Sequence, residues 1–164
     1  MIKQNSVDKI WEDINLIQSI QEMIDAISDL VEEQKSKPWT KKQCNEWASK
    51  AGIYEPWTYA DNSLVFPNGK IETKFSLDFW PNKISELPEG LTRINGVLDL
   101  NGQDIETLPS SLQYIGGALT LDNTKVKKWP PNFQYIKRNL YIRNCPIQLP
   151  PNIKNIVKGK IVRE

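Results

Sequence analysis

The residues of this chain that could do chemistry are two cysteines and a set of carboxylates, because its 164 residues include no histidine. Histidine is the side chain most used as a general base near neutral pH, and it is the commonest metal ligand. Without it, a Ser-His-Asp or Cys-His nucleophile is excluded. Cys44 and Cys145 are too few and too far apart for a disulfide framework or a zinc site. We therefore expect no metal and no cofactor.

The carboxylates of Asp78 and Asp99 are the remaining candidates for catalysis, since they stand at equivalent positions 21 residues apart. Paired carboxylates can do acid–base work, but no insertion near them would form a pocket, so we interpret them as a solvated charged patch. The glycines at 116–117 occur where the neighbouring repeats have Asn-Gly (95–96) or Lys-Arg (137–138). This favours a turn over a phosphate-binding loop. The sequence predicts that the protein is not an enzyme.

Both aspartates belong to a 21-residue repeat, and the repeat defines the elements that position them. Its apolar positions are Leu77, Leu98, Leu119 and Leu140; Phe79, Leu100, Leu121 and Ile142; Ile84, Ile105, Val126 and Ile147; Leu91, Leu112, Phe133 and Ile153; and Ile94, Ile115, Ile136 and Ile156. A Leu-Pro or Trp-Pro pair precedes the last two sets, and one residue is missing in the final unit. One coil buries too little apolar surface to offset the entropy of ordering it, whereas stacked coils share a core.

We therefore predict an α/β solenoid of four to five coils with a short parallel β-sheet over residues 75–164. The pattern L.L..N.I..LP..L..I.G resembles the leucine-rich repeat, in the short Leu-Pro form of bacterial and bacteriophage proteins. The stretch "PWTYADNSLVFPNGKIETKFSLDF" is similar to the strand-turn-strand entry of phage-encoded repeat proteins, so the resemblance covers residues 57 to about 164. It implies a curved module that binds other macromolecules.

The resemblance also assigns one polar position in each coil. The repeat consensus has asparagine or cysteine there, and its side chain satisfies backbone groups of adjacent coils. In this chain the position is filled by Asn82, Gln103, Thr124 and Cys145. The resemblance therefore implies that Cys145 is a buried structural thiol.

Residues 1–36 predict a long acidic helix that Ser6 caps, with eight acids and three lysines in residues 1–35. Its apolar stripe consists of Ile10, Ile17, Ile20, Ile24, Ile27 and Val31. At ~1.5 Å per residue the helix is about 43 Å long, whereas stacked strands of the solenoid span only about 24 Å. Either residues 7–35 pair with a second chain in a homodimeric coiled coil, or the helix folds back on the next helix and caps the solenoid.

Residues 37–74 predict a second helix and a strand-turn-strand cap. Thr40 and Gln43 have the spacing of a capping box, Gly52 ends the helix, and Gly69 stands at the turn between the two strands. The aromatic residues of this region are Trp39, Trp47, Tyr54, Trp57 and Tyr59. We interpret them as filling the open end of the first coil, in preference to a ligand cage or a base-stacking platform. Cys44 is interpreted as structural.

The repeat register predicts which side chains point outward from the sheet. The first column is Asp78, Asp99, Thr120 and Tyr141, and the second is Trp80, Asn101, Asp122 and Arg143. This concave face is the predicted protein-binding surface. The C-terminal half adds a basic patch of Lys125, Lys127, Lys128, Lys137, Arg138, Lys158, Lys160 and Arg163, and no acid occurs between Asn123 and Arg163.

These features favour a non-enzymatic protein-binding module, encoded by a phage or mobile element, that inhibits or modulates a host defence complex. The partner is then a host or cellular protein with an acidic surface. One alternative is nucleic-acid binding through the basic half, and another is a scaffold that self-assembles through the acidic helix. The sequence has neither a secretory apolar segment nor a run of about 18 apolar residues. We expect no membrane partner and a cytoplasmic location.

Overall fold

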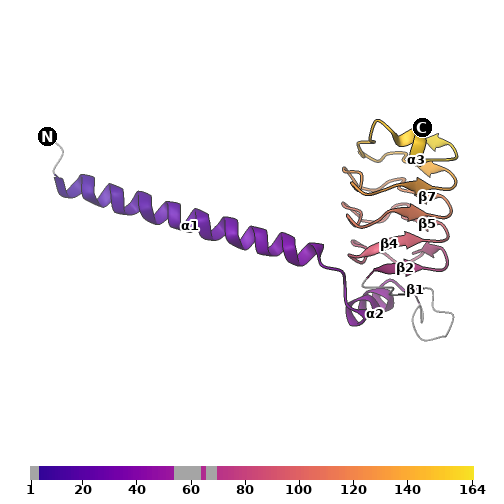
Figure 1. Ribbon diagram of the computed structural model, residues 1–164, viewed down its shortest axis with the longest axis horizontal. Helices are drawn as coiled ribbons and strands as arrows, with labels where there is room; N and C mark the ends of the chain where they lie inside the picture. The colour runs from indigo at the N-terminus through magenta and orange to yellow at the C-terminus, as the bar shows by residue number, and fades with distance from the viewer. Residues whose placement is uncertain (1–3, 54–63, 66–69) are drawn as a thin grey trace. The chain divides into compact units, whose positions relative to one another are not determined.

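The computed structural model describes residues 4–53, 64–65 and 70–164, with side chains for residues 9–30, 37–53 and 70–164. The chain divides into two compact units, Met1–Lys37 and Pro38–Glu164. The first unit is the helix α1 (Gln4–Ser36), and the second contains a solenoid (Figure 1). Among the described residues, no helix is long and apolar enough to cross a membrane.

Helix α1 starts at Gln4, two residues before the predicted cap. The expectation that Ser6 caps the helix is therefore wrong, because Ser6 lies inside the first helical turn. Neither proline nor glycine occurs in residues 1–36 to interrupt the helix, so its pattern continues without a break. The predicted long helix is confirmed.

Helix α2 (Lys41–Lys50) has the predicted capping box. The backbone N–H of Thr40 donates to Gln43 Oε1 over 2.8 Å, and the backbone N–H of Gln43 donates to Thr40 Oγ1 over 3.3 Å. The helix ends at Lys50, and Gly52 follows in the left-handed region with φ of +69°. Glycine adopts this conformation without a steric penalty, which explains the helix stop.

The inner face of α2 closes the first coil of the solenoid. Cys44, Trp47 and Ala48 are buried in the same core as Phe79, whose ring lies edge-on to that of Trp47 with centroids 5.8 Å apart. Trp47 Nε1 donates to the backbone oxygen of Glu86 over 2.9 Å, and Trp39 packs edge-on against Trp47. The interpretation that aromatic residues fill the open end of the first coil is thus confirmed for Trp39 and Trp47. The other three aromatic residues of this prediction, Tyr54, Trp57 and Tyr59, lie outside the described residues.

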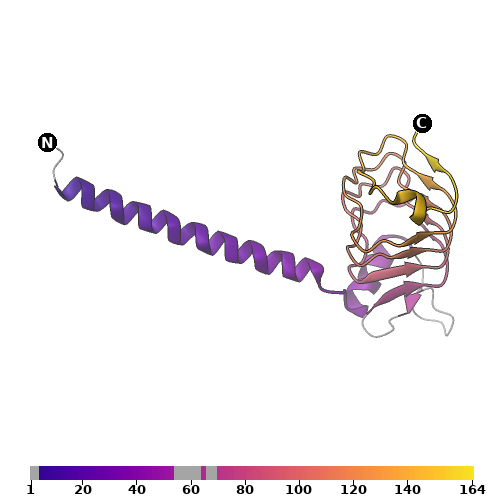
Figure 2. The same cartoon turned by 45° about the horizontal axis from the view of Figure 1, so that its top comes forward.

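The solenoid has two sheets, and successive coils contribute a strand to each, as β4 and β5 do with three residues between them (Figures 1 and 2). Sheet I runs in the order β10 (Ile161–Val162), β9 (Leu140–Tyr141), β7 (Leu119–Thr120), β5 (Leu98–Asp99), β3 (Leu77–Asp78). Sheet II runs in the order β1 (Leu64–Val65), β2 (Ile71–Thr73), β4 (Leu91–Ile94), β6 (Tyr114–Ile115), β8 (Tyr135–Ile136). Helix α3 (Ile153–Ile156) follows in the last coil. Neighbouring strands within sheet I are all parallel and lie 21 residues apart in register.

Sheet II is an addition to the prediction, which described one parallel sheet and an extended return path. The return path itself pairs from coil to coil, as in Arg93 with Tyr114 and Tyr114 with Tyr135. Strand β4 buries Leu91, Thr92 and Ile94 and leaves Arg93 half-buried, so the return path packs apolar side chains on the core while its backbone pairs with the neighbouring coils. Strands β1 and β2 form the predicted antiparallel cap. Its turn residue, Gly69, lies outside the described residues.

The core follows the repeat as predicted. Leu98, Leu119 and Leu140 of sheet I are fully buried, as are Ile94, Ile115 and Ile136 of sheet II. The predicted corner at 116–117 is also confirmed, because these residues form a bend between β6 and β7, and a Cβ on Gly116 would collide with the backbone of Asn95 in the preceding coil. Since each coil rests directly on its neighbours, the outward side chains are held at fixed positions along both sheets.

Candidate interaction surface

The outward positions of sheet I form the first column, as the register pairs Asp78 with Asp99, Asp99 with Thr120, and Thr120 with Tyr141. Asp78 is exposed, and the other three are half-buried. In the second column Trp80 is 84 % exposed, and Asn101 and Arg143 are exposed. Asp122 differs, because it is only 7 % exposed.

The two aspartates at the start of the first column serve the backbone of their own coils. Asp78 Oδ1 accepts a hydrogen bond from the N–H of Trp80, and Asp99 Oδ1 accepts one from the N–H of Asn101, each over 3.0 Å. These carboxylates close the turn after each strand. Over the described part of the chain, no three histidine, cysteine or acidic residues gather as metal ligands would.

Asp122 lies inward because two donors of the next coil bind its carboxylate. The backbone N–H of Arg143 donates to Oδ1 over 2.6 Å, and a guanidinium nitrogen of Arg143 lies 3.3 Å from Oδ2. The guanidinium also donates through Nε to the backbone oxygen of Glu164 over 3.3 Å. Asp122 thus orients Arg143 in place of presenting its own carboxylate to a partner.

Tyr141 and Arg143 stand side by side at the basic end of sheet I. The guanidinium carbon of Arg143 lies 5.8 Å from the centroid of the Tyr141 ring, within cation–π range. Asn139 Nδ2 donates to the Tyr141 hydroxyl over 2.9 Å, while its Oδ1 accepts from the backbone N–H of Lys160 over 2.9 Å. Both side chains are therefore held by a hydrogen-bonded neighbour before any partner arrives.

Asn139 is the residue of this surface that sequence reasoning missed. The sequence did offer a signal, because the equivalent position is apolar in the two middle coils, Val97 and Ala118, but polar in the coils on either side, Ser76 and Asn139. At the equivalent position in the first coil, Ser76 Oγ accepts from the N–H of Val97 over 2.9 Å. A polar residue there bridges to the backbone of the following coil.

The basic residues do not line one stripe. All eight members of the predicted patch are exposed: Lys125, Lys127, Lys128, Lys137, Arg138, Lys158, Lys160 and Arg163. The first three follow strand β7, whereas Lys137 and Arg138 follow β8 of the other sheet. Lys125 Nζ lies 2.6 Å from Asp104 Oδ1, and the hydrogen bond and charge of this pair lower the pKa of Asp104 and raise the pKa of Lys125.

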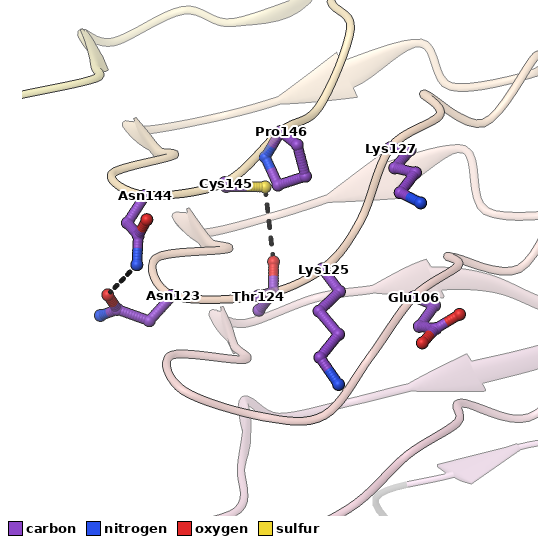
Figure 3. A pocket seen from close by; sticks show the side chains of 8 residues that line it. All are labelled: Glu106, Asn123, Thr124, Lys125, Lys127, Asn144, Cys145 and Pro146. Carbon is purple, nitrogen blue, oxygen red and sulfur yellow. Dashed lines mark hydrogen bonds between the residues drawn. The ribbon is translucent and has the colours of Figure 1, made fainter.

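Lys125 and Lys127 line a surface pocket of about 700 Å³, together with Glu106, Asn123, Asn144 and Cys145 (Figure 3). Its rim is a ladder of asparagines, in which Asn144 Nδ2 donates to Asn123 Oδ1 over 3.2 Å and Asn123 Nδ2 donates to Asn101 Oδ1 over 3.1 Å. Asn123 and Asn144 adopt left-handed backbone conformations. Asparagine tolerates these conformations better than most residues.

At the polar consensus position, Gln103 and Cys145 bond to backbone groups of the preceding coil as the resemblance implied, whereas Thr124 Oγ1 donates to the backbone oxygen of Leu121 in its own coil. Gln103 accepts from the N–H of Ile84 and donates to the backbone oxygen of Asn82, so it bridges two coils. The Cys145 thiol likewise donates to the backbone oxygen of Val126 over 3.6 Å. Cys145 is half-buried, however, and not fully buried as expected, because its sulfur borders the pocket in Figure 3.

The protein is therefore a parallel β-solenoid with 21-residue coils, and its outward polar side chains are aligned in columns along sheet I. Comparisons with family models, curated proteins and solved structures found no match to the chain.

Proposed function

We propose that this protein is a non-enzymatic protein-binding module that docks its partner on the outer face of sheet I. The observation that carries the proposal is the pair Tyr141 and Arg143, which Asn139 and Asp122 hold in place. Tyrosine and arginine are enriched among the residues that dominate binding energy. Side chains that are already ordered lose less entropy when they bind.

The chemistry of the surface selects the partner's charge. Arg143 lies beside the ordered tyrosine, and the exposed Lys160 and Arg163 flank the neighbouring strand β10, whereas Asp78 and Asp99 occupy the opposite end of the sheet. A partner with an acidic patch opposite the Tyr141 end would match this gradient, and complementary charge raises the rate of association.

The finer form of the proposal follows the sequence resemblance. The module is a leucine-rich repeat protein of a phage or mobile element, and it acts in the bacterial cytoplasm on a host protein such as a defence complex. Its support is the 21-residue coil with its Leu-Pro corner. Fold likeness alone does not fix function, so the surface residues carry the test.

The test is capture of partners from a bacterial lysate by immobilised protein, quantified by mass spectrometry. We expect the double variant Tyr141→Ala with Arg143→Ala to lose a partner that wild type retains, by about 1–3 kcal/mol of affinity. Lys128→Ala is the matched control, because it removes one exposed positive charge elsewhere. Equal capture by wild type and the double variant would refute the proposed face.

Nucleic-acid binding by the basic residues is the alternative function. The test is a gel shift with nonspecific duplex DNA at 50 mM salt. A shift whose log affinity falls linearly with the logarithm of the salt concentration would show that the basic residues bind nucleic acid and would replace the proposed function. No shift at that salt removes nucleic acid as the ligand.

A further inference from the structure

Helix α1 carries an apolar stripe that its own unit does not cover. Ten large apolar side chains among those described in the helix are between 38 % and 65 % exposed: Ile10, Trp11, Ile14, Leu16, Ile17, Ile20, Met23, Ile24, Ile27 and Leu30. All of these except Trp11 lie on the stripe, and at roughly 60–120 Å² per buried side chain the nine offer on the order of 500–1,100 Å². That exceeds the exposed apolar patch of an ordinary monomer.

The helix also needs this stripe to be packed. Six of its residues are isoleucines, whose branched side chains lower helix propensity. Most helical stability in proteins comes from packing an amphipathic face, and not from propensity. The stability of a 33-residue helix of this composition is thus explained if another protein segment packs against its apolar stripe.

The stripe repeats every seven residues and fixes a coiled-coil register. The first core position holds Ile10, Ile17, Ile24 and Val31, the second core position holds Ile20 and Ile27, and the position that flanks the first core residue holds Leu16, Met23 and Leu30. The acids Glu12, Glu22, Asp25, Asp29, Glu32 and Glu33 all fall on the three outer positions. The acidic charge of the helix therefore faces solvent when copies associate through the stripe.

The residue types at these positions favour more than two helices. Isoleucine at both core positions shifts coiled coils from two strands toward three or four. In two-stranded coils the flanking positions are often charged. Here Leu16, Met23 and Leu30 are apolar, and a two-helix pair would leave much of this surface in water. A wider bundle covers it.

We propose that α1 joins three copies of this chain in a parallel coiled coil over residues 14–34, in place of the pair expected from the stripe alone. A closed ring of three identical copies has three-fold symmetry, which requires the helices to be parallel. Asp13 falls on the second core position, so the bundle ends at its N-terminal side, where three carboxylates would otherwise face one another.

Trimerisation gives the solenoid a multivalent form. Where the partner is itself repeated or oligomeric, three linked copies of sheet I bind it more tightly than one, because the second contact is intramolecular. This consequence, unlike the trimer itself, rests on the proposed function of sheet I. Measuring the mass of the protein without any partner tests the trimer independently of the proposed function of sheet I.

The test is sedimentation equilibrium of the full chain at several concentrations. We expect a mass of about 57 kDa, which is three times the 18.9 kDa chain. Ile20→Leu with Ile27→Leu places leucine at the second core position, a choice that favours two strands, and should shift the mass to about 38 kDa. Gln18→Ala is the control on an outer position and should remain trimeric.

A second variant guards against misfolding. Ile17→Glu with Ile24→Glu should yield a monomer that keeps the solenoid, as shown by unchanged near-ultraviolet circular dichroism from the tryptophans of the second unit. Wild type with the mass of one chain would overturn the proposal in favour of an intrachain cover on the stripe. A wild-type mass of two or four chains, or a trimer that survives both glutamates, would also overturn it.

Discussion

The ring of Tyr114 stacks on the ring of Tyr135 along sheet II, with centroids 5.1 Å apart and planes 10° from parallel. The stack continues at both ends, since the guanidinium carbon of Arg93 lies 3.6 Å from the Tyr114 centroid and Lys158 Nζ lies 5.7 Å from that of Tyr135. Successive coils are thus joined on this side by ring and cation contacts as well as by backbone pairing.

Replacing Tyr135 with alanine removes the central contact of this stack. We expect a loss of about 1–2 kcal/mol in the free energy of unfolding, from the aromatic pair and the cation contact together. Urea denaturation followed by tryptophan fluorescence measures it. Gln134→Ala, an exposed neighbour outside the stack, should change stability by less than about 0.5 kcal/mol. Identical midpoints for the two variants would show that the stack contributes nothing.

Asn139 acts on binding through Tyr141. Asn139→Ala removes the hydrogen bond to the Tyr141 hydroxyl and should weaken partner binding by about 1 kcal/mol, the net value of one such bond. The measurement is the affinity for the partner that sheet I captures. Ser76→Ala is matched, because Ser76 makes the equivalent backbone bridge in a coil without the tyrosine. If both variants bind equally well, Asn139 has only a structural role.

The two cysteines should differ in reactivity. Cys44 is fully buried, and burial raises the pKa of its thiol to about 11, so almost no thiolate is present at pH 8. Cys145 borders the pocket and is half-buried. Iodoacetamide at pH 8 should add one group per folded chain, at Cys145, and a second only in denaturant. Peptide mapping that finds equal labelling of both cysteines in the folded protein contradicts this.

Glu89 is a local cost to stability at neutral pH. Its Oε2 atom is buried without a hydrogen-bond partner, and burial raises the pKa of the carboxyl. A carboxyl whose pKa is higher in the folded state than in the unfolded state favours folding when protonated and opposes it when ionised. Glu89→Gln should therefore stabilise the protein by about 1 kcal/mol at pH 7, the low end for an unpaired buried polar group.

The pH dependence of that effect is its control. The gain in melting temperature from Glu89→Gln should shrink as pH falls to about 4, where the wild-type carboxyl is becoming protonated. A gain that is the same at pH 7 and pH 4 would assign the effect to something other than ionisation.

The solenoid could be predicted from sequence because each coil repeats the same apolar positions, and burial of those positions decides the fold. Phe79, Leu100 and Leu121 are as deeply buried as their spacing predicted. The second sheet was not evident, because two-residue strands such as β6 leave no alternation long enough to distinguish a strand from an extended connection. The start of α1 was misplaced since Ser6 has the chemistry of a cap but lies where the helix already runs.

The site was less predictable than the fold, because register fixes where a residue stands but not which bonds it makes. Tyr141 and Arg143 were placed on the outer face from spacing alone. Asp122 was expected to point outward with them, and no pattern along the chain shows that the next coil's N–H groups draw its carboxylate inward. Likewise, the role of Asn139 depends on Tyr141 two residues later and on the backbone of Lys160, which only the stacked coils bring together.

The uniform 21-residue register of sheet I makes this protein extensible in whole units. Because each coil rests on its immediate neighbours, an in-frame duplication of residues 97–117 would insert one more coil between existing ones and lengthen the sheet by about 4.8 Å. The new coil would carry its own outward aspartate while the buried leucines continue unbroken. Gene duplication can therefore lengthen the outer face of sheet I one coil at a time, and the hydrophobic interior needs no compensating change.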